Sequence, residues 1–323
     1  MKIAVIGTGV MGRNHLRVLS SFPDISEIIA VDSNEENLNI AKKEYFISKC
    51  YTDYKDLIRN EKTDGVIVAT PPVSHKEIAI DFLNTGHNVM VEKPISHSYT
   101  EAQEIIAAAE KAGTVFTVGH IERFNPVITK IKEFIDNKLL SNIYIINTQR
   151  VGPVPKRLLG NIEGVLIDLA VHDIDIIHYL GKGIIESVKS DVLKLKKQEI
   201  YAKALMRLDN GILASSEFSW ISPRRMRIIE IYGDEGMILG DYYNQEVLFF
   251  ENGDYEKYAS EITEAFFGAG KITAGKIINY PLYKQEPLIL ELKNFINAIK
   301  GTEKVFIKPQ EALICLEKVL TIQ

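Results

Sequence analysis

The chain has 323 residues, a length that predicts about two domains at ~150 residues per domain. Hydrophobic residues make up 46% and charged residues 25%, which is the composition of a globular protein and excludes disorder, collagen-like repeats and coiled coil. The formal net charge of -5 argues against nonspecific nucleic-acid binding, which needs clustered positive charge.

Short apolar runs alternate with helical patterns through the first third of the chain. We predict strands at 2–6, 27–31, 65–69, 88–91 and 114–118, and helices at 11–21, 34–43, 75–84 and 99–112. This alternation is typical of βαβ units that build a mostly parallel sheet. Residues 1–120 are therefore expected to form one doubly wound domain whose parallel strands are joined by helical crossovers.

The pattern changes in residues 121–323, which we predict to form an α+β domain. After a helix at 125–137, strand-length runs follow one another without helices, among them 143–151, 201–208 and 212–220, and Asp209-Asn210-Gly211 is a hairpin signal. Three more helices are expected at 165–180, 287–300 and 309–320, the first ending at Gly181. We therefore expect a large, open, mainly antiparallel sheet, with helix 165–180 at the domain interface and helix 309–320 packing back on the first domain.

A glycine-rich loop follows the first predicted strand. Gly7-Thr8-Gly9-Val10-Met11-Gly12 matches G-x-G-x-x-G and opens a helix, as dinucleotide binding requires. The first glycine permits a tight turn, the second lets a pyrophosphate approach the backbone, and the third lets helix and strand pack closely. The motif alone is weak, because a plain glycine turn or a methyltransferase loop has the same pattern.

Asp32 strengthens the interpretation, because it follows Gly12 by twenty residues at the end of the second strand. A carboxylate there accepts hydrogen bonds from both ribose hydroxyls of an adenosine. The same charge would repel a 2'-phosphate, and the following Ser33 and Asn34 supply no arginine to hold one. We therefore predict NAD rather than NADP, with Ser33 beside the cofactor.

Two further groups end strands on the same sheet edge. Thr70 and Pro71 end one strand, with His75 opening the next helix, and Glu92-Lys93-Pro94 ends another. Ligands of doubly wound folds bind at this edge, so the residues expected near the cofactor are Thr70, Pro71, His75, Glu92 and Lys93. Lys93 can polarise a substrate hydroxyl or exchange a proton with it.

The predicted helix 165–180 carries Asp168 and His172, four residues apart and so on one face. A carboxylate one turn from an imidazole can fix its tautomer, and His172 could then take a proton from an alcohol. The alternative is that His172 is a core residue whose ring is hydrogen-bonded within the protein and has no catalytic role. Asp173, Asp175 and His178 are interpreted as capping or solvent groups. No metal is expected, because spacing indicates no third ligand.

The chain carries no sign of export or membrane insertion. Its longest stretches without a charged residue, 65–75 and 139–149, have eleven residues, whereas a transmembrane helix needs ~20. The apolar start leads straight into the glycine turn and is too short for a signal peptide. Cys50 and Cys315 stand far apart, which disfavours a disulfide scaffold and fits a cytoplasmic protein.

Taken together, these motifs resemble the Gfo/Idh/MocA oxidoreductase family over essentially the whole chain. The supporting residues are Gly7 to Gly12, Thr70-Pro71-Pro72 with His75, Glu92-Lys93-Pro94, Gly119-His120, Arg123-Phe124-Asn125-Pro126, and Asp168 with His172. The resemblance implies an NAD-binding Rossmann domain and a second domain with an open sheet. It also implies that Lys93, Asp168 and His172 are catalytic and line the substrate site. Ala170 departs from the glycine found in many members.

Within the family, residues 150–155, 168–175 and 220–225 look most like the branch of UDP-N-acetylglucosamine 3-dehydrogenases. The resemblance implies NAD-dependent oxidation of a sugar hydroxyl, at C3 of that nucleotide sugar, to a keto group. His120 and Asn125 are expected to contact the substrate, and Arg150, Arg157, Arg224 or Arg225 a diphosphate.

Several alternatives remain at this point. An inositol or a free aldose would use the same core residues, and a non-catalytic NAD-sensing regulator could share the fold. A methyltransferase is remote once the second half is considered. The expected partners are a small-molecule substrate and, as is common in the family, further copies of the chain in a homo-dimer or homo-tetramer through the open sheet.

Overall fold

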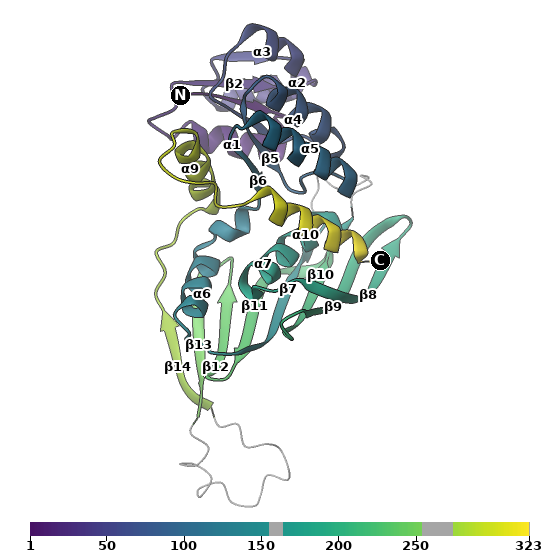
Figure 1. Cartoon of the computed structure of the whole chain (residues 1–323), viewed down its shortest axis with the longest axis vertical. Coiled ribbons are helices and arrows are strands. Elements are labelled where there is room, and N and C mark those ends of the chain that lie inside the picture. Colours follow the sequence, from purple (N-terminus) through teal and green to yellow (C-terminus); the bar gives the residue numbers. More distant parts are fainter. Residues whose placement is uncertain (155–163, 254–273, 323) are drawn as a thin grey trace, which may run out of the picture. The chain divides into compact units, whose positions relative to one another are not determined.

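The computed structural model describes residues 1–154, 164–253 and 274–322. It divides into two compact units (Figure 1). Unit 1 comprises residues 1–124 and 286–317, and unit 2 comprises residues 125–285 and 318–323. Among the described residues, no helix is long and apolar enough to cross a membrane.

Unit 1 contains the predicted parallel sheet. Its six strands lie in the order β3-β2-β1-β4-β5-β6, and every neighbouring pair is parallel. The strands are β1 (Lys2–Ile6), β2 (Glu27–Val31), β3 (Lys49–Tyr51), β4 (Gly65–Val68), β5 (Asn88–Glu92) and β6 (Phe116–Gly119). The helices of its first segment are α1 (Val10–Leu19), α2 (Glu35–Glu44), α3 (Tyr54–Asn60), α4 (His75–Asn84) and α5 (Tyr99–Ala112), with short 3-10 turns η1 (Pro72–Ser74) and η2 (Ile121–Phe124).

Both faces of this sheet are covered by an apolar layer, because side chains alternate along each strand. Ala4 and Ile6 of β1 belong to the layer that includes α3, α4 and α5. Ile3 and Val5 of the same strand belong to the layer that includes α1 and α2. The central strands are therefore buried on both sides, which explains their nearly unbroken apolar sequences.

The C-terminal part of the chain corrects the predicted boundary, which assigned all of 121–323 to the second domain. Helix α9 (Pro287–Ile299) completes the α1 layer of unit 1, where Leu292 and Phe295 are buried. Helix α10 (Pro309–Thr321) belongs to unit 1 as far as Glu317, and its Ala312 and Leu316 join the opposite layer. Unit 1 is thus built from two chain segments that are distant in sequence.

Unit 2 contains an eight-stranded sheet in the order β14-β13-β12-β11-β7-β10-β9-β8. Only β7 and β10 are paired in parallel among its described strands, so the sheet is mainly antiparallel, as predicted. The strands are β7 (Ile143–Pro153), β8 (Ile185–Leu195), β9 (Gln198–Leu208), β10 (Leu213–Ser219), β11 (Ile221–Gly233), β12 (Gly236–Asp241), β13 (Glu246–Asn252) and β14 (Ala274–Tyr280).

Helices α6 (Pro126–Asp136) and α7 (Val171–Gly181) lie against one face of this sheet (Figure 1). A π-helical segment, η4 (Leu166–Ala170), precedes α7. The prediction that Gly181 ends the helix is wrong. The helix includes Gly181, and Lys182 adopts the left-handed backbone conformation that ends it. Gly181 is instead a close-approach residue, since a Cβ there would lie 2.6 Å from Leu208 Cδ2 of β9.

Candidate functional site

The glycine loop connects β1 to α1 and has the shape that a pyrophosphate needs. Gly7 has a φ of +89°, and a Cβ there would lie 2.7 Å from the carbonyl oxygen of Ala69. A Cβ on Gly12 would overlap the Gly7 carbonyl, whereas a Cβ on Gly9 would meet nothing within 4 Å. The open space at Gly9, directly before the N-terminus of α1, fits an anionic group held by backbone N–H donors. The residues present therefore fit a dinucleotide.

Asp32 is already oriented by the protein. Its Oδ2 accepts hydrogen bonds from the Thr8 backbone N–H (2.7 Å) and the Thr8 hydroxyl (2.9 Å). The Asn34 N–H donates to Oδ1 (2.9 Å) and the Asn37 side chain to Oδ2 (3.3 Å). Four donors fix the carboxylate at the end of β2, the position of a ribose-binding acid. Ser33 beside it is exposed.

Two residues of α1 belong to this region although the sequence reasoning missed them. Arg13 donates from Nη1 to the carbonyl of Thr8 (3.1 Å), so an arginine does lie beside the loop that holds Asp32. His15 is fully buried, and its Nε2 lies 2.7 Å from Oε1 of Glu92. Their position directly after Gly12 could have indicated this, because the first turns of α1 lie at the edge of the sheet where the glycine loop binds its ligand.

The loops after β4 and β5 place the remaining cofactor candidates at one sheet edge. Thr70 is half-buried and Pro71 is exposed, whereas His75 is fully buried. The ring nitrogens of His75 lie on two backbone carbonyls, Nε2 2.8 Å from Thr70 O and Nδ1 3.0 Å from Pro94 O. Its imidazole is thus used inside the protein. Lys93 is half-buried at the end of β5.

A second carboxyl group lies buried in this part of unit 1. Glu291 of α9 is 3% exposed, and neither of its side-chain oxygens has a hydrogen-bond partner among the residues that the structure describes. Burial, followed by the charges of Glu92 and Glu122, raises the pKa of Glu291 well above its usual range. Glu291 therefore retains its proton to a higher pH than an ordinary glutamate does.

In unit 2, Asp168 is buried and His172 is half-buried, with η4 ending between them. A π-helix advances fewer degrees per residue than an α-helix, so the simple four-residue spacing does not by itself give their relative direction. Short π-helical segments occur frequently at functional sites.

The interpretation of Asp173 and Asp175 as capping or solvent groups is wrong, because both are 1% exposed. Arg150 donates from Nε (2.9 Å) and Nη2 (2.7 Å) to Oδ1 of Asp173, and its side chain is 2% exposed. Arg150 is thus committed to a buried ion pair that joins β7 to α7, which corrects its expected contact with a diphosphate. His178, near the C-terminus of α7, has its Nδ1 3.0 Å from the Gly183 carbonyl, which fits the expected capping role.

The other predicted arginines are placed differently. Arg224 and Arg225 are exposed in β11, where the pairing with β7 shifts register between Ile221 and Met226. Such bulges redirect side chains, and the Arg225 side chain passes over Gly152 of β7. Arg157 lies outside the described residues.

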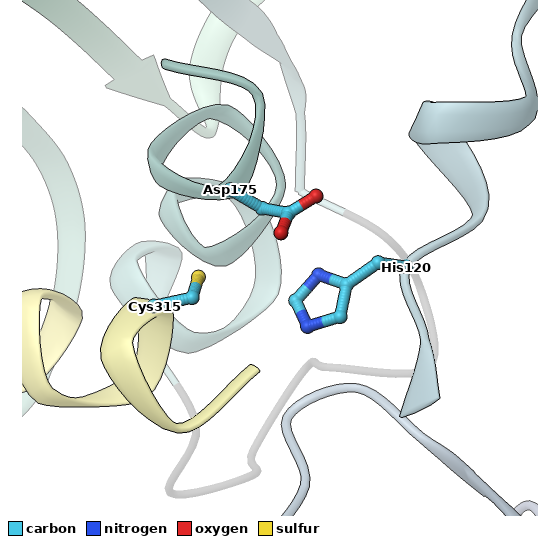
Figure 2. A group of neighbouring side chains, drawn as sticks. All are labelled: His120, Asp175 and Cys315. Carbon is cyan, nitrogen blue, oxygen red and sulfur yellow. The ribbon is translucent and has the colours of Figure 1, made fainter. Parts of the chain in front are cut away.

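His120 and Asn125 both have roles within the protein. His120 follows β6 and is 2% exposed, and the Asn125 side chain caps α6 by accepting from Val127 N–H (3.1 Å). Figure 2 shows His120 near Cys315 of α10, with their ligand atoms within 4.8 Å. Asp175, the third labelled residue, belongs to unit 2. Within the described residues, neither unit alone brings three metal-ligating atoms together at this distance, and two ligands do not make a metal site.

The glycine loop, the fixed Asp32 and the parallel sheet define an NAD-binding oxidoreductase. A family model described as "Oxidoreductase family, NAD-binding Rossmann fold" matches residues 1–120, and the GFO/IDH/MocA C-terminal domain model matches residues 128–239. The chain belongs to the Gfo/Idh/MocA family. It is an NAD-dependent dehydrogenase with a small-molecule substrate.

Relatives and solved structures are similar to the chain over nearly its whole length. Myo-inositol 2-dehydrogenase of Thermotoga maritima is 25% identical over 98% of this chain and 93% of its own length. The structure of UDP-N-acetylglucosamine 3-dehydrogenase GnnA from Acidithiobacillus ferrooxidans has a TM-score of 0.85 at 22% identity, covering 100% of this chain and 96% of that one. The WlbA dehydrogenase of Bordetella pertussis, solved with NADH and UDP-GlcNAcA, has a TM-score of 0.81 at 20% identity, covering 100% and 94%. At these identities the two structures show the fold alone.

Proposed function

We propose that the protein oxidises a sugar hydroxyl to a keto group with NAD, at C3 of UDP-N-acetylglucosamine, giving UDP-3-keto-N-acetylglucosamine. The main support for this function is Asp32, which is held in place beside an open glycine loop. The same unit contains a half-buried Lys93 at the end of β5. The nucleotide-sugar substrate is supported by the names of two solved structures with this fold, GnnA and the WlbA dehydrogenase.

The proposed residues have distinct roles in this chemistry. NAD, when bound, accepts the hydride. Lys93 holds and polarises the reacting oxygen, and His172 takes the hydroxyl proton. Asp168 orients the sugar and His172. Thr8, Gly9 and Asp32 hold the adenosine half of the cofactor.

The experiment follows NADH absorbance with UDP-N-acetylglucosamine as substrate. Lys93→Ala and His172→Ala should each lose about 100-fold to 10,000-fold in kcat, because a positioned acid or base contributes that much. Asp168→Asn should show an intermediate loss or a larger one. The Kd of NAD should change by less than about threefold. Near-native turnover of His172→Ala with an unchanged pH profile would transfer its role to Lys93.

An inositol is the second candidate substrate, because the myo-inositol 2-dehydrogenase of Thermotoga maritima aligns over nearly the whole chain. The same residues would act on a ring hydroxyl of a cyclitol. Assays with inositols, free aldoses and the nucleotide sugar at equal concentration separate the candidates.

We also propose that a second copy of the chain covers the open face of the unit 2 sheet. Leu193 of β8 and Leu205 of β9 are 52% and 51% exposed. Leu205 of β9 lies directly opposite Lys189 of β8, and Leu193 is four residues after Lys189 on the same strand. Because side chains alternate between the two faces of a sheet, both leucines lie on one face. Replacing both by Lys should give a smaller species in sedimentation, whereas Phe46→Lys in unit 1 should not. An unchanged sedimentation coefficient would contradict this interface.

A further inference from the structure

Lys93 stands between two buried neighbours. Glu92 is 7% exposed, and Pro94 and Ile95 are buried, whereas Lys93 itself is half-buried. A lysine side chain has four rotatable bonds, so the position of its ammonium depends first on how firmly its backbone is held. The contacts of residues 92 and 94 therefore decide where the Lys93 side chain starts.

His15 holds the residue before Lys93. Its Nε2 lies 2.7 Å from Oε1 of Glu92, and the other oxygen of that carboxylate accepts the Lys93 backbone N–H at 3.3 Å. A Cβ on Gly119 would lie 3.1 Å from the same carboxylate, so the glycine leaves room for it. The Glu92 carboxylate thus connects α1 to the backbone of Lys93.

His75 holds the residue after Lys93. Its Nδ1 lies 3.0 Å from the Pro94 carbonyl, and its Nε2 lies 2.8 Å from the Thr70 carbonyl. Burial lowers the pKa of His75, so the ring is neutral and has a single N–H to donate. One tautomer holds the loop of Lys93, and the other holds the loop of Thr70.

We propose that His15 and His75 are positioning residues for Lys93, one acting through Glu92 and the other through Pro94. The proposal rests on the proposed function, because it assigns the two histidines to the same reaction. A displacement of about 1 Å in a reacting group can cost about 100-fold in rate. The Glu92 carboxylate on one side of Lys93, and His75 in the tautomer with its proton on Nδ1 on the other side, reduce such displacement.

Conservative variants test each link separately. His15→Gln keeps a donor at the place of Nε2, whereas His15→Asn is too short to reach Glu92. His75→Asn keeps a donor at the place of Nδ1, facing Pro94, whereas His75→Gln keeps only the one facing Thr70. We expect kcat to fall about 10-fold to 100-fold in His15→Asn and His75→Gln, and less than about threefold in the other two.

The matched control is His87→Gln. His87 is also buried in unit 1, but it directly precedes β5, at the end opposite Lys93. It should leave kcat unchanged, and the Kd of NAD should be alike in all five variants. If both members of each pair lost kcat equally, the hydrogen-bond links would not be the cause and the proposal would fail.

A double-mutant cycle with Lys93→Ala separates positioning from a general structural effect. If the histidines act through Lys93, adding His15→Asn or His75→Gln to Lys93→Ala should reduce kcat by less than about twofold further. A full additional loss of 10-fold to 100-fold would overturn the proposal.

A readout without turnover keeps the test independent of the substrate. If no sugar or inositol is oxidised, the proposed function fails, and the rate of amine labelling at Lys93 is measured by peptide mass spectrometry. We expect His15→Asn to label severalfold faster than His15→Gln, because a looser backbone exposes the amine. Equal labelling of Lys93 in all variants would reject the positioning role.

Discussion

At the scale of single residues, fixed charges distinguish this molecule from an ordinary glycine-turn protein. Asp32 receives four donors before any ligand arrives, so little reorganisation is needed when ribose hydroxyls bind. Arg13 of α1 lies beside the same loop but donates to the Thr8 carbonyl, so part of its hydrogen-bonding capacity is already used. The carboxylate therefore dominates cofactor choice.

Asp32→Ala should weaken NAD binding about 10-fold to 100-fold and narrow the difference between NAD and NADP, because a charged hydrogen bond is lost and the repulsion of a 2'-phosphate disappears. Asp32→Asn is the companion variant, since it keeps an acceptor for the Thr8 N–H. Fluorescence titration of both cofactors provides the Kd values. Equal affinity of the native protein for NAD and NADP would contradict this role.

Glu291 provides a pH-dependent term in stability. Its pKa is raised by burial and by Glu92 and Glu122, so the folded state retains a proton that the unfolded state releases above about pH 4.3. The stability from this group is fully present below that pH and is lost as pH rises toward the folded pKa. Glu291→Gln stays neutral at every pH, so this variant should not lose stability from this group as the pH rises.

We therefore expect urea unfolding to show similar stability of the native protein and Glu291→Gln near pH 4.5. The variant should become more stable as pH rises, by up to about 1.4 kcal/mol per pH unit between the two pKa values. The exposed Glu35, changed to Gln, is the control and should show no such trend. Parallel pH profiles for native protein and Glu291→Gln would show that Glu291 ionises without cost.

At the scale of elements, the sequence predicted what local patterns encode. The bounds of β2, α4 and α5 match the expectations, because apolar runs and capping residues mark them. The three-residue β3 and the seven-residue α3 were not among the predicted elements, since neither is long enough to show a period. The partnership of α9 with α1 is a contact across some 270 residues, which no local pattern reports.

The candidate site likewise contains some features that local sequence patterns predict and others that they do not. Its loops at Gly7 and at Lys93 follow from strand ends and were predictable. The buried partners were not, because the Arg150–Asp173 and His15–Glu92 pairs join elements that the sequence shows only separately. The π-helical turn before α7 likewise leaves no signature in hydrophobic spacing.

Gly181 allows a test of helix propensity against close packing. Gly→Ala inside a helix normally stabilises by about 1 kcal/mol. Here the new Cβ would lie 2.6 Å from Leu208 Cδ2, and Leu208 is 1% exposed, so we expect a net loss of about 1–3 kcal/mol in urea unfolding. Leu208→Val should relieve the overlap, so the double variant should lose less than the two single losses summed. A stabilised Gly181→Ala would show that propensity prevails.

At the scale of the whole molecule, the two units contribute different kinds of evidence. Unit 1 has a loop and an acid whose geometry fits one cofactor, which is why the class follows from its residues. Unit 2 has an open sheet with α6 and α7 against one face, and proteins similar to this chain are named for different substrates, a nucleotide sugar and an inositol. Because fold does not determine substrate, selectivity must come from side chains that vary within this frame.

The substrate prediction now depends on fewer arginines than the sequence suggested. Arg150 is buried against Asp173, so its removal should lower stability rather than change selectivity. Arg224 and Arg225 are exposed in the β11 bulge, and guanidinium groups match phosphate oxygens in geometry. A sugar linked to a diphosphate would gain binding energy there that a free sugar lacks.

We therefore expect kcat/KM for UDP-N-acetylglucosamine to exceed that for free N-acetylglucosamine by at least about 100-fold. Arg224→Gln and Arg225→Gln should each reduce this ratio by about tenfold if a charged hydrogen bond to the diphosphate is lost. Arg207→Gln, at an exposed position of β9, is the control and should not reduce it. Steady-state assays of both sugars side by side give the ratio for each variant. Equal kcat/KM values, or activity only on an inositol or a free aldose, would reject the nucleotide-sugar substrate and leave the dehydrogenase assignment intact, because cofactor binding depends on Asp32 and the glycine loop rather than on these arginines.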